Sequence, residues 1–253
     1  MRTAFAVALL LLEACTGSPG ISNVPAGPPA ARNDTITIAD FKRIVSWGAK
    51  GKSAIAQCPQ PYKVVAGGSS SSDGSSVGTG YADLNVNGWV VKPESGAAAE
   101  SFATCVLRGR FGSAFHWRSS AANSGVAGAQ CPLGWMLITG YGQGTVTASW
   151  FDPKNNTYWV TGGGTAYASC ARNRLGIVIR HAWNQSQNPK AVFAGCGSGY
   201  TVIGGAMGDN AWPGPPIQQH PGVSSDPGQH GYKGWWTFSN ALNELTWAAC
   251  VQT

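Results

Sequence analysis

Three segments of the chain repeat one pattern, and this internal repeat limits the possible folds more than any other feature. The segments align without a gap from their first cysteine, as residues 58–67, 131–140 and 196–205. Each reads cysteine, Pro or Gly, any residue, Pro or Gly, an aromatic residue, any residue, two aliphatic residues, any residue and glycine. Self-similarity of this kind is the signature of a fold built from equivalent units. We therefore expect three units that share one core.

The repeats also agree outside this segment. Each closes on an aromatic residue, alanine, a small residue and cysteine, at residues 102–105, 167–170 and 247–250. These features mark four short strands per repeat, and the repeated glycine at 67, 140 and 205 is expected to end the second strand in a turn or bulge. Two tryptophan positions recur as well, one before the first cysteine (Trp47, Trp117, Trp183) and one before the closing segment (Trp89, Trp159, and Trp235 or Trp236).

The composition favours strands. Charged residues make up 11% of the chain, against about 25% in an average soluble domain. The many glycines and tryptophans suit short strands joined by turns rather than long helices. We predict an all-β fold in which a threefold repeat of about four strands each forms a β-prism, with a β-trefoil or a small propeller-like arrangement as alternatives. The single β domain is expected to span residues 36–253, with repeats at about 36–110, 111–175 and 176–253.

The repeat resembles that of the vitelline membrane outer layer protein I family. A tryptophan-bearing strand, a Cys-Pro-x-Gly turn, a later glycine and a closing cysteine carry the resemblance, at Trp117, Cys131, Pro132, Gly134, Gly140 and Cys170. The resemblance implies a β-prism with threefold repeats and a lectin-like association with oligosaccharides. The family's Asp-Asp-Thr-Ala-x-Asn stretch is absent from this chain, so the resemblance implies the architecture and no site residue.

The N-terminus is typical of an export signal. A short basic segment and an apolar run of nine residues (4–12) precede Cys15, and that run is too short to span a bilayer. Leu12 three residues before the cysteine resembles a bacterial lipobox, which predicts cleavage after residue 14 and lipidation of Cys15. Residues 15–35 would then form a flexible tether. We expect an extracytoplasmic protein, either anchored by lipid in a bacterial cell envelope or, as the alternative, secreted.

The other six cysteines are expected to form disulfides. Two pairing schemes respect the threefold repeat, one within repeats and one that joins the end of each repeat to the start of the next. We favour pairing within repeats, because the two cysteines of a repeat lie at matching ends of its strand set. The predicted disulfides are Cys58–Cys105, Cys131–Cys170 and Cys196–Cys250.

No pattern of catalytic residues is found. The chain has no paired-carboxylate motif and no Cys-x-x-Cys or His-x-x-x-His metal motif. Its net charge of +6 is scattered rather than gathered in a basic stripe, which argues against nucleic acid as a partner. We therefore predict no metal, no cofactor and no enzymatic activity. Of the four histidines, His116 and His181 are expected on surface strands, and His220 and His230 in a loop.

The third repeat carries the longest link between its second and third strands, at residues 206–234. Long ordered loops on a rigid scaffold often bind ligands. The alternative is that this loop folds back to cap the open end of the prism. The next choice of site would be the shorter loop around Trp150, Phe151 and Asp152 in the second repeat. The ligand-binding residues proposed for the long loop are Asp209, Asn210, Trp212, His220 and Tyr232.

These features favour a binding module for carbohydrate or another cell-surface ligand, because aromatic faces stack on sugar rings and Asp or Asn binds hydroxyl groups. A structural or envelope-interaction lipoprotein and, less favoured, a glycan-acting hydrolase are the alternatives.

Overall fold

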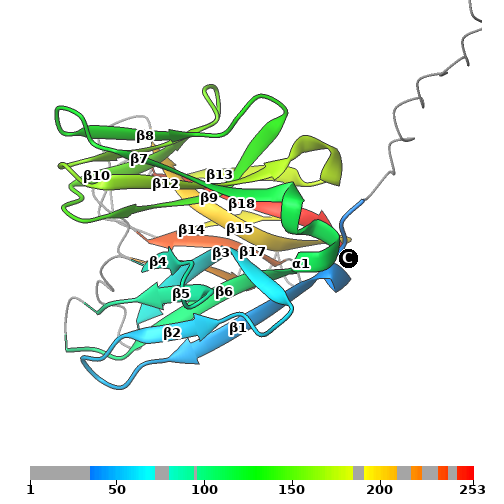
Figure 1. Cartoon of the computed structure of the whole chain (residues 1–253), viewed down its shortest axis with the longest axis horizontal. Helices are drawn as coiled ribbons and strands as arrows, with labels where there is room; N and C mark the ends of the chain where they lie inside the picture. The colour runs from blue at the N-terminus through cyan, green and yellow to red at the C-terminus, as the bar shows by residue number, and fades with distance from the viewer. Residues whose placement is uncertain are drawn as a thin grey trace, which may run out of the picture. The chain divides into compact units, whose positions relative to one another are not determined.

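A computed structural model describes residues 35–71, 80–93, 96–184, 191–209, 218–223, 233–238 and 244–253 of the protein (Figure 1). These residues belong to one compact unit. They form 18 strands, one short helix, α1 (Arg108–Phe111), and three 3-10 turns, η1 (Ile38–Asp40), η2 (Gly112–Ala114) and η3 (Asn173–Leu175). The all-β fold and its threefold repeat are therefore confirmed.

Each repeat contributes six strands, since the structure adds a second and a fourth strand to the four marked by the sequence. The first repeat comprises β1 (Phe41–Trp47), β2 (Ala54–Gln57), β3 (Tyr62–Ser71), β4 (Gly80–Asp83), β5 (Gly88–Val91) and β6 (Ala99–Leu107). The second comprises β7 (Phe115–Ala121), β8 (Val126–Gln130), β9 (Trp135–Gln143), β10 (Ala148–Asp152), β11 (Thr157–Thr161) and β12 (Thr165–Arg172). The third comprises β13 (Val178–Asn184), β14 (Ala191–Gly195), β15 (Tyr200–Asp209), β16 (Gln218–Val223), β17 (Lys233–Phe238) and β18 (Glu244–Gln252).

The six strands of a repeat form two antiparallel three-stranded sheets. The first, sixth and third strands form the sheet that we call inner, with orders β1-β6-β3, β7-β12-β9 and β13-β18-β15. The second, fifth and fourth strands form the outer sheet, with orders β2-β5-β4, β8-β11-β10 and β14-β17-β16. A single pairing of Gln219 with Ser69 also joins the outer sheet of the third repeat to the inner sheet of the first. The result is a prism-like arrangement of three two-layer units.

The paired aliphatic residues of the repeat serve two different cores. Val64 packs in the core between the two sheets of its own repeat, whereas Val65 packs in a core shared by all three repeats. A bulge separates them: Val64 pairs with Cys105 and the next pair is Ala66 with Thr104, so Val65 lies outside the ladder. The same bulge recurs in the other repeats and directs Ile138 and Ile203 into the shared core.

The repeated glycines do not end their strands, so that prediction is wrong. β3 continues to Ser71, β9 to Gln143 and β15 to Asp209. Each glycine instead lies directly beneath a buried aromatic ring. A Cβ atom on Gly67 would lie 2.1 Å from Trp89 Cδ2, one on Gly140 2.2 Å from Tyr158 Cγ, and one on Gly205 2.3 Å from Trp235 Cγ. The glycines are needed for this close approach rather than for a turn.

The structure pairs the cysteines within repeats, as predicted, and the alternative scheme is wrong. The disulfides are Cys58–Cys105, Cys131–Cys170 and Cys196–Cys250. Each lies in the core between the two sheets of its own repeat. Because disulfides persist in oxidising compartments, the folded chain belongs to an extracytoplasmic environment.

The long link of the third repeat is partly strand. β15 continues into this segment as far as Asp209. β16 also lies inside the segment predicted as a loop, and it pairs with β17. The export signal, Cys15 and the tether as far as residue 34 lie outside the described residues. Within the described part of the chain, no helix is long and apolar enough to cross a membrane.

Candidate functional site

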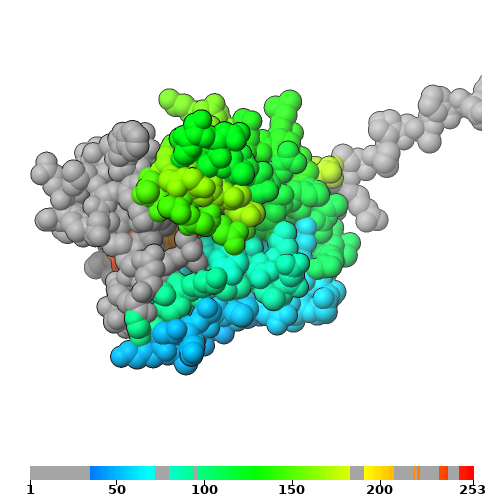
Figure 2. Space-filling view, turned by 60° about the vertical axis from the view of Figure 1, so that its left-hand side comes forward, coloured from blue at the N-terminus to red at the C-terminus, as the bar shows by residue number. Residues whose placement is uncertain are grey.

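The interfaces between neighbouring repeats enclose very different volumes. Figure 2 shows the second repeat, in green, against the first, in blue and cyan. A cavity of about 390 Å³ lies between these two repeats. At the equivalent place between the second and third repeats the cavity is about 10 Å³. Since the repeats share one fold, the side chains must cause this difference. The cavity of about 240 Å³ between the third and first repeats lies elsewhere, between β1 and β15, and no residue of an outer sheet lines it.

We call the cavity between the first two repeats the cleft. The first repeat lines it with the end of β4 and the turn that follows, residues 81–85. The second repeat lines it with its inner sheet, through Trp117, Arg118 and Ser119 of β7, Tyr141 and Gln143 of β9, and Tyr167 of β12.

An exchange of large and small residues across the interface opens the cleft. In β10 of the second repeat, the Phe151 ring packs edge-on against Trp247 of the third repeat, with ring centres 5.0 Å apart. Ala82 of β4 occupies the position equivalent to Phe151, because each pairs with the buried aromatic residue of its own outer sheet. The partner position, on the inner sheet of the following repeat, shows the opposite exchange: it holds Tyr141 at the cleft and Ala206 at the interface between the second and third repeats. At the cleft, the large ring therefore comes from the inner sheet of the second repeat and the small residue from β4.

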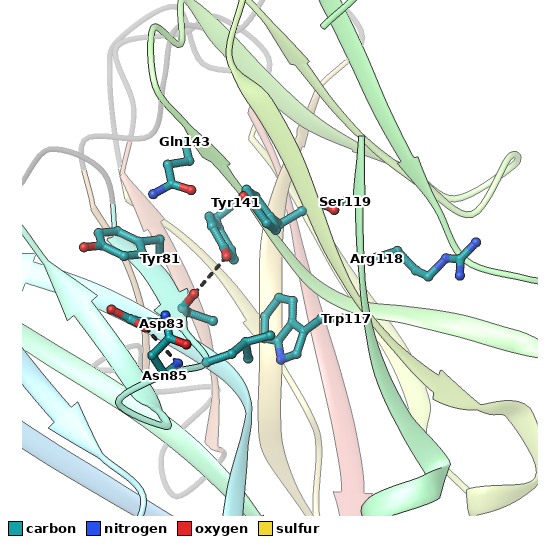
Figure 3. Close-up of a pocket in the computed structure, with 11 residues that line it drawn as sticks. Tyr81, Asp83, Asn85, Trp117, Arg118, Ser119, Tyr141 and Gln143 are labelled. Atoms are coloured by element: carbon teal, nitrogen blue, oxygen red, sulfur yellow. Dashed lines mark hydrogen bonds between the residues drawn. The ribbon is translucent and has the colours of Figure 1, made fainter. Parts of the chain in front are cut away.

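Four aromatic rings form the wall of the cleft, and Tyr141 lies at their centre. Tyr141 stacks on Tyr167 with ring centres 4.6 Å apart and planes 5° from parallel. Its ring centre lies 5.6 Å from that of Trp117 and 6.4 Å from that of Tyr81. The Tyr141 hydroxyl donates a hydrogen bond of 3.0 Å to the carbonyl oxygen of Ala82 (Figure 3). Burial, together with nearby Tyr167 and Asp83, strongly raises the pKa of Tyr141, so the hydroxyl stays protonated and keeps this bond at neutral pH.

A second hydrogen bond fixes the tryptophan. The indole Nε1 of Trp117 donates to the carbonyl oxygen of Val64, 3.2 Å away, beside the bulge of β3. Arg43 occupies the equivalent position in the first repeat and donates to the carbonyl oxygen of Val202 at 2.8 Å. The strand position of Trp117 and Arg43 thus connects neighbouring repeats, and in the second repeat its side chain also forms part of the wall of the cleft.

Polar groups surround the rings. The Asp83 carboxylate accepts a hydrogen bond of 2.9 Å from the backbone N–H of Asn85 and shapes the turn after β4. Asn85 and Gln143 are exposed at the rim. Figure 3 shows Asp83, Asn85 and Gln143 on the same side as Tyr81, whereas the Arg118 guanidinium extends away from Tyr141. The open cleft therefore offers carboxylate and amide groups beside an aromatic wall.

The turn between β4 and β5 is held in place by Asn87. This residue has a positive φ of 52°, a conformation that asparagine tolerates better than most residues. Its side-chain amide donates to the carbonyl oxygen of Tyr62 at 2.8 Å and its oxygen accepts from the Val64 N–H at 3.1 Å. Asn156 makes equivalent bonds to Trp135 and Leu137 in the second repeat. The turn that supplies Asp83 is therefore fixed to β3.

The ligand residues predicted from the sequence are not brought together in the described part of the chain. Asp209 ends β15 and pairs with β18, whereas His220 lies in β16 and pairs with β17. Asn210, Trp212 and Tyr232 lie outside the described residues. His116 and His181 are exposed in β7 and β13, as expected.

Sequence reasoning missed the cleft, although the repeated motifs include two of its residues, Trp117 and Tyr167. Trp117 was aligned with Trp47 and Trp183, but the strand register places Ala121 at the position of those two residues. Trp117 thus lies four residues earlier on the same face of its strand. Varying loop lengths before the first cysteine conceal this offset in the sequence, and we find no sequence signal that would have shown it.

Among the described residues, no cluster of three His, Cys, Asp or Glu side chains could hold a metal ion. A comparison with models of known protein families and with curated protein sequences finds no match.

Proposed function

We propose that the protein is an exported carbohydrate-binding module and that the cleft between the first two repeats binds a sugar. One observation carries the proposal: a cavity of about 390 Å³ that combines an aromatic wall with a rim of carboxylate and amide groups. Small-molecule sites usually enclose about 300–1,000 Å³ and combine apolar walls with a few placed polar groups. A pyranose ring matches this chemistry because it has an apolar face and a ring of hydroxyl groups.

The rings of the wall are fixed before any ligand arrives. Tyr141 is held by its bond to Ala82 and Trp117 by its bond to Val64. A preorganised wall reduces the conformational entropy lost on binding. This rigidity supports a role in recognition.

We propose binding without cleavage. Among the described residues that line the cleft, Asp83 is the one carboxylate, whereas glycoside hydrolysis generally uses a pair of them.

We further propose that lipid on Cys15 anchors the protein to the cell envelope and that residues 15–35 tether the domain. Leu12 before the cysteine and the even number of cysteines left for disulfides support this anchor.

A glycan array probed with the exported, purified protein tests the proposal, followed by titration of the best oligosaccharide. Tyr81→Ala removes a half-buried ring at the mouth of the cleft and should weaken binding at least tenfold. Leu133→Ala is the matched control, because Leu133 is fully exposed and lies outside the cleft. Retained binding in Tyr81→Ala and Asp83→Ala, or an array without any bound glycan, would contradict the proposal.

A further inference from the structure

A second aromatic surface lies on the outer sheet of the second repeat. Trp150 of β10 and Trp159 of β11 are directly paired across the strands. Their ring centres are 6.3 Å apart and their planes differ by 21°. Both side chains are half-buried. We call this pair of nearly parallel rings the platform.

A glycine on the neighbouring strand makes room for the platform. Gly128 of β8 pairs with Trp159, and a Cβ atom on Gly128 would lie 2.5 Å from the ring carbon Cζ3. The indole therefore lies flat over β8. In the first repeat the positions of Trp150, Trp159 and Gly128 hold Tyr81, Val90 and Ile55, which form the same sheet without a pair of stacked rings. The fold itself does not require these tryptophans or this glycine.

Asp152 lies beside Trp159 at the edge of the platform. Its carboxylate accepts hydrogen bonds from the Asn155 side chain at 2.7 Å and from the Lys154 backbone N–H at 3.0 Å. Burial raises the pKa of Asp152, but its interactions with Asn155, Trp159 and Lys154 outweigh this effect and the net shift is downward. The platform therefore has a charged acceptor at its edge at neutral pH.

Further polar groups flank the two rings. Gln130 lies beyond Gly128 on the same face of β8 and donates to the carbonyl oxygen of Asn155 at 3.0 Å. Thr161 follows Trp159 on the same face of β11, and its hydroxyl lies 3.0 Å from that of Thr147. Aromatic rings with hydroxyl, amide and carboxylate groups at both ends match a chain of sugar rings rather than an apolar protein surface.

We infer that the Trp150–Trp159 platform binds an extended polysaccharide chain, at a site separate from the cleft. A surface on the outer side of a sheet can contact several successive sugar units, whereas the cleft accommodates a short segment. The platform would hold the protein on a polysaccharide, while the cleft would bind one or two of its sugar units selectively. The inference draws on the same ligand class as the proposed function, but different residues carry it.

The test measures retention of the exported protein on insoluble cellulose, chitin and purified peptidoglycan. Trp150→Ala and Trp159→Ala should each weaken retention on the bound polymer at least tenfold, with thermal unfolding confirming that the variants are folded. Gly128→Val should do the same by displacing the Trp159 ring. Ile55→Ala is the matched control, because Ile55 holds the position of Gly128 in the first repeat and is exposed.

Titration with short soluble oligosaccharides separates this inference from the proposed function. Platform variants should keep that binding, which Tyr81→Ala should lose. Folded Trp150→Ala and Trp159→Ala variants with normal retention would overturn the inference. No retention of the unaltered protein on any polymer would overturn it as well. So would a change of sedimentation coefficient in the platform variants, since that result would make the platform a contact between two copies of the chain.

Discussion

The indole of Trp117 donates a hydrogen bond to the backbone carbonyl of Val64, and this 3.2 Å contact joins the inner sheets of the first two repeats. Val64 lies at the bulge that directs the next residue, Val65, into the shared core. The same indole forms part of the wall of the cleft. One side chain thus serves both the assembly of the repeats and the candidate site.

Trp117→Phe should therefore lower both stability and affinity. Phenylalanine keeps most of the ring but leaves the Val64 carbonyl without this donor, which should cost about 1–3 kcal/mol. Denaturant unfolding measures this loss, and titration with the cleft ligand measures the affinity. Arg43→Met is the control, because it removes the equivalent bond to Val202 at the interface with the third repeat. It should lower stability and leave ligand affinity unchanged; a parallel loss of affinity in both variants would argue against a specific role of Trp117.

Gly67→Ala should destabilise the first repeat strongly. The added Cβ would lie 2.1 Å from Trp89, whose ring is fully buried. Overpacking of this kind should cost about 3 kcal/mol, as measured by denaturant unfolding. Gly109→Ala is the control, since a Cβ there meets no atom within 4 Å, and its effect should stay within about 0.5 kcal/mol. Equal stabilities of the two variants would refute the close-approach explanation for the repeated glycines.

The features that obey the threefold symmetry could be predicted from the sequence. Each repeat has one disulfide, so its two cysteines recur. Each has one bulge, so the aliphatic pair recurs. Each has a buried aromatic ring lying over β3, β9 or β15, so the glycine beneath that ring recurs. The second and fourth strands were missed because their sequences diverge. β2, for example, alternates buried Ala54 and Ala56 with exposed Ile55, so its apolar residues show no simple pattern.

The cleft could not be predicted because it arises where the symmetry breaks. The cleft depends on which side of an interface supplies the large ring, and sequence alone does not show that Ala82 faces Tyr141.

The platform was predicted only in part: Trp150 and Asp152 were the second choice of site, but they were expected in a loop and lie in strand β10. Its other ring was hidden by an alignment error of one residue. Tyr158, rather than Trp159, occupies the buried position of Trp89, so Trp159 is free to lie on the opposite face of the sheet.

The platform should respond to acid through Asp152. Its folded-state pKa is lowered, so its contribution to stability is present above the unfolded-state pKa and is lost as the pH falls through the folded-state pKa. Asp152→Asn, which mimics the protonated carboxyl, should therefore be less stable than the unaltered protein at pH 7. The two proteins should become equally stable in strong acid. Unfolding measured across this range checks the prediction, and a difference that does not change with pH would count against it.

Cys15 should carry lipid. Leu12 three residues earlier is typical of lipoprotein processing, and the other six cysteines are paired with one another. Metabolic labelling with a fatty-acid probe should mark the exported protein, and Cys15→Ser should abolish both the label and membrane association. A Cys15→Ser protein that is processed and localised normally would exclude the anchor.

Exchanging two residues should close the cleft without harming the fold. The double variant Ala82→Phe, Tyr141→Ala copies the arrangement of Phe151 and Ala206 at the second interface, where the remaining cavity is about 10 Å³. Tyr141→Ala alone should cost about 3–5 kcal/mol, because it removes a largely buried ring and leaves a void. The added phenylalanine can pack against Tyr167 as Phe151 packs against Trp247, so the double variant should recover most of this stability. It should nevertheless lose oligosaccharide binding, because the new ring occupies the space of the ligand. Denaturant unfolding and ligand titration on the same preparations check both outcomes. A stable double variant that still binds the oligosaccharide would place the sugar site elsewhere on the molecule.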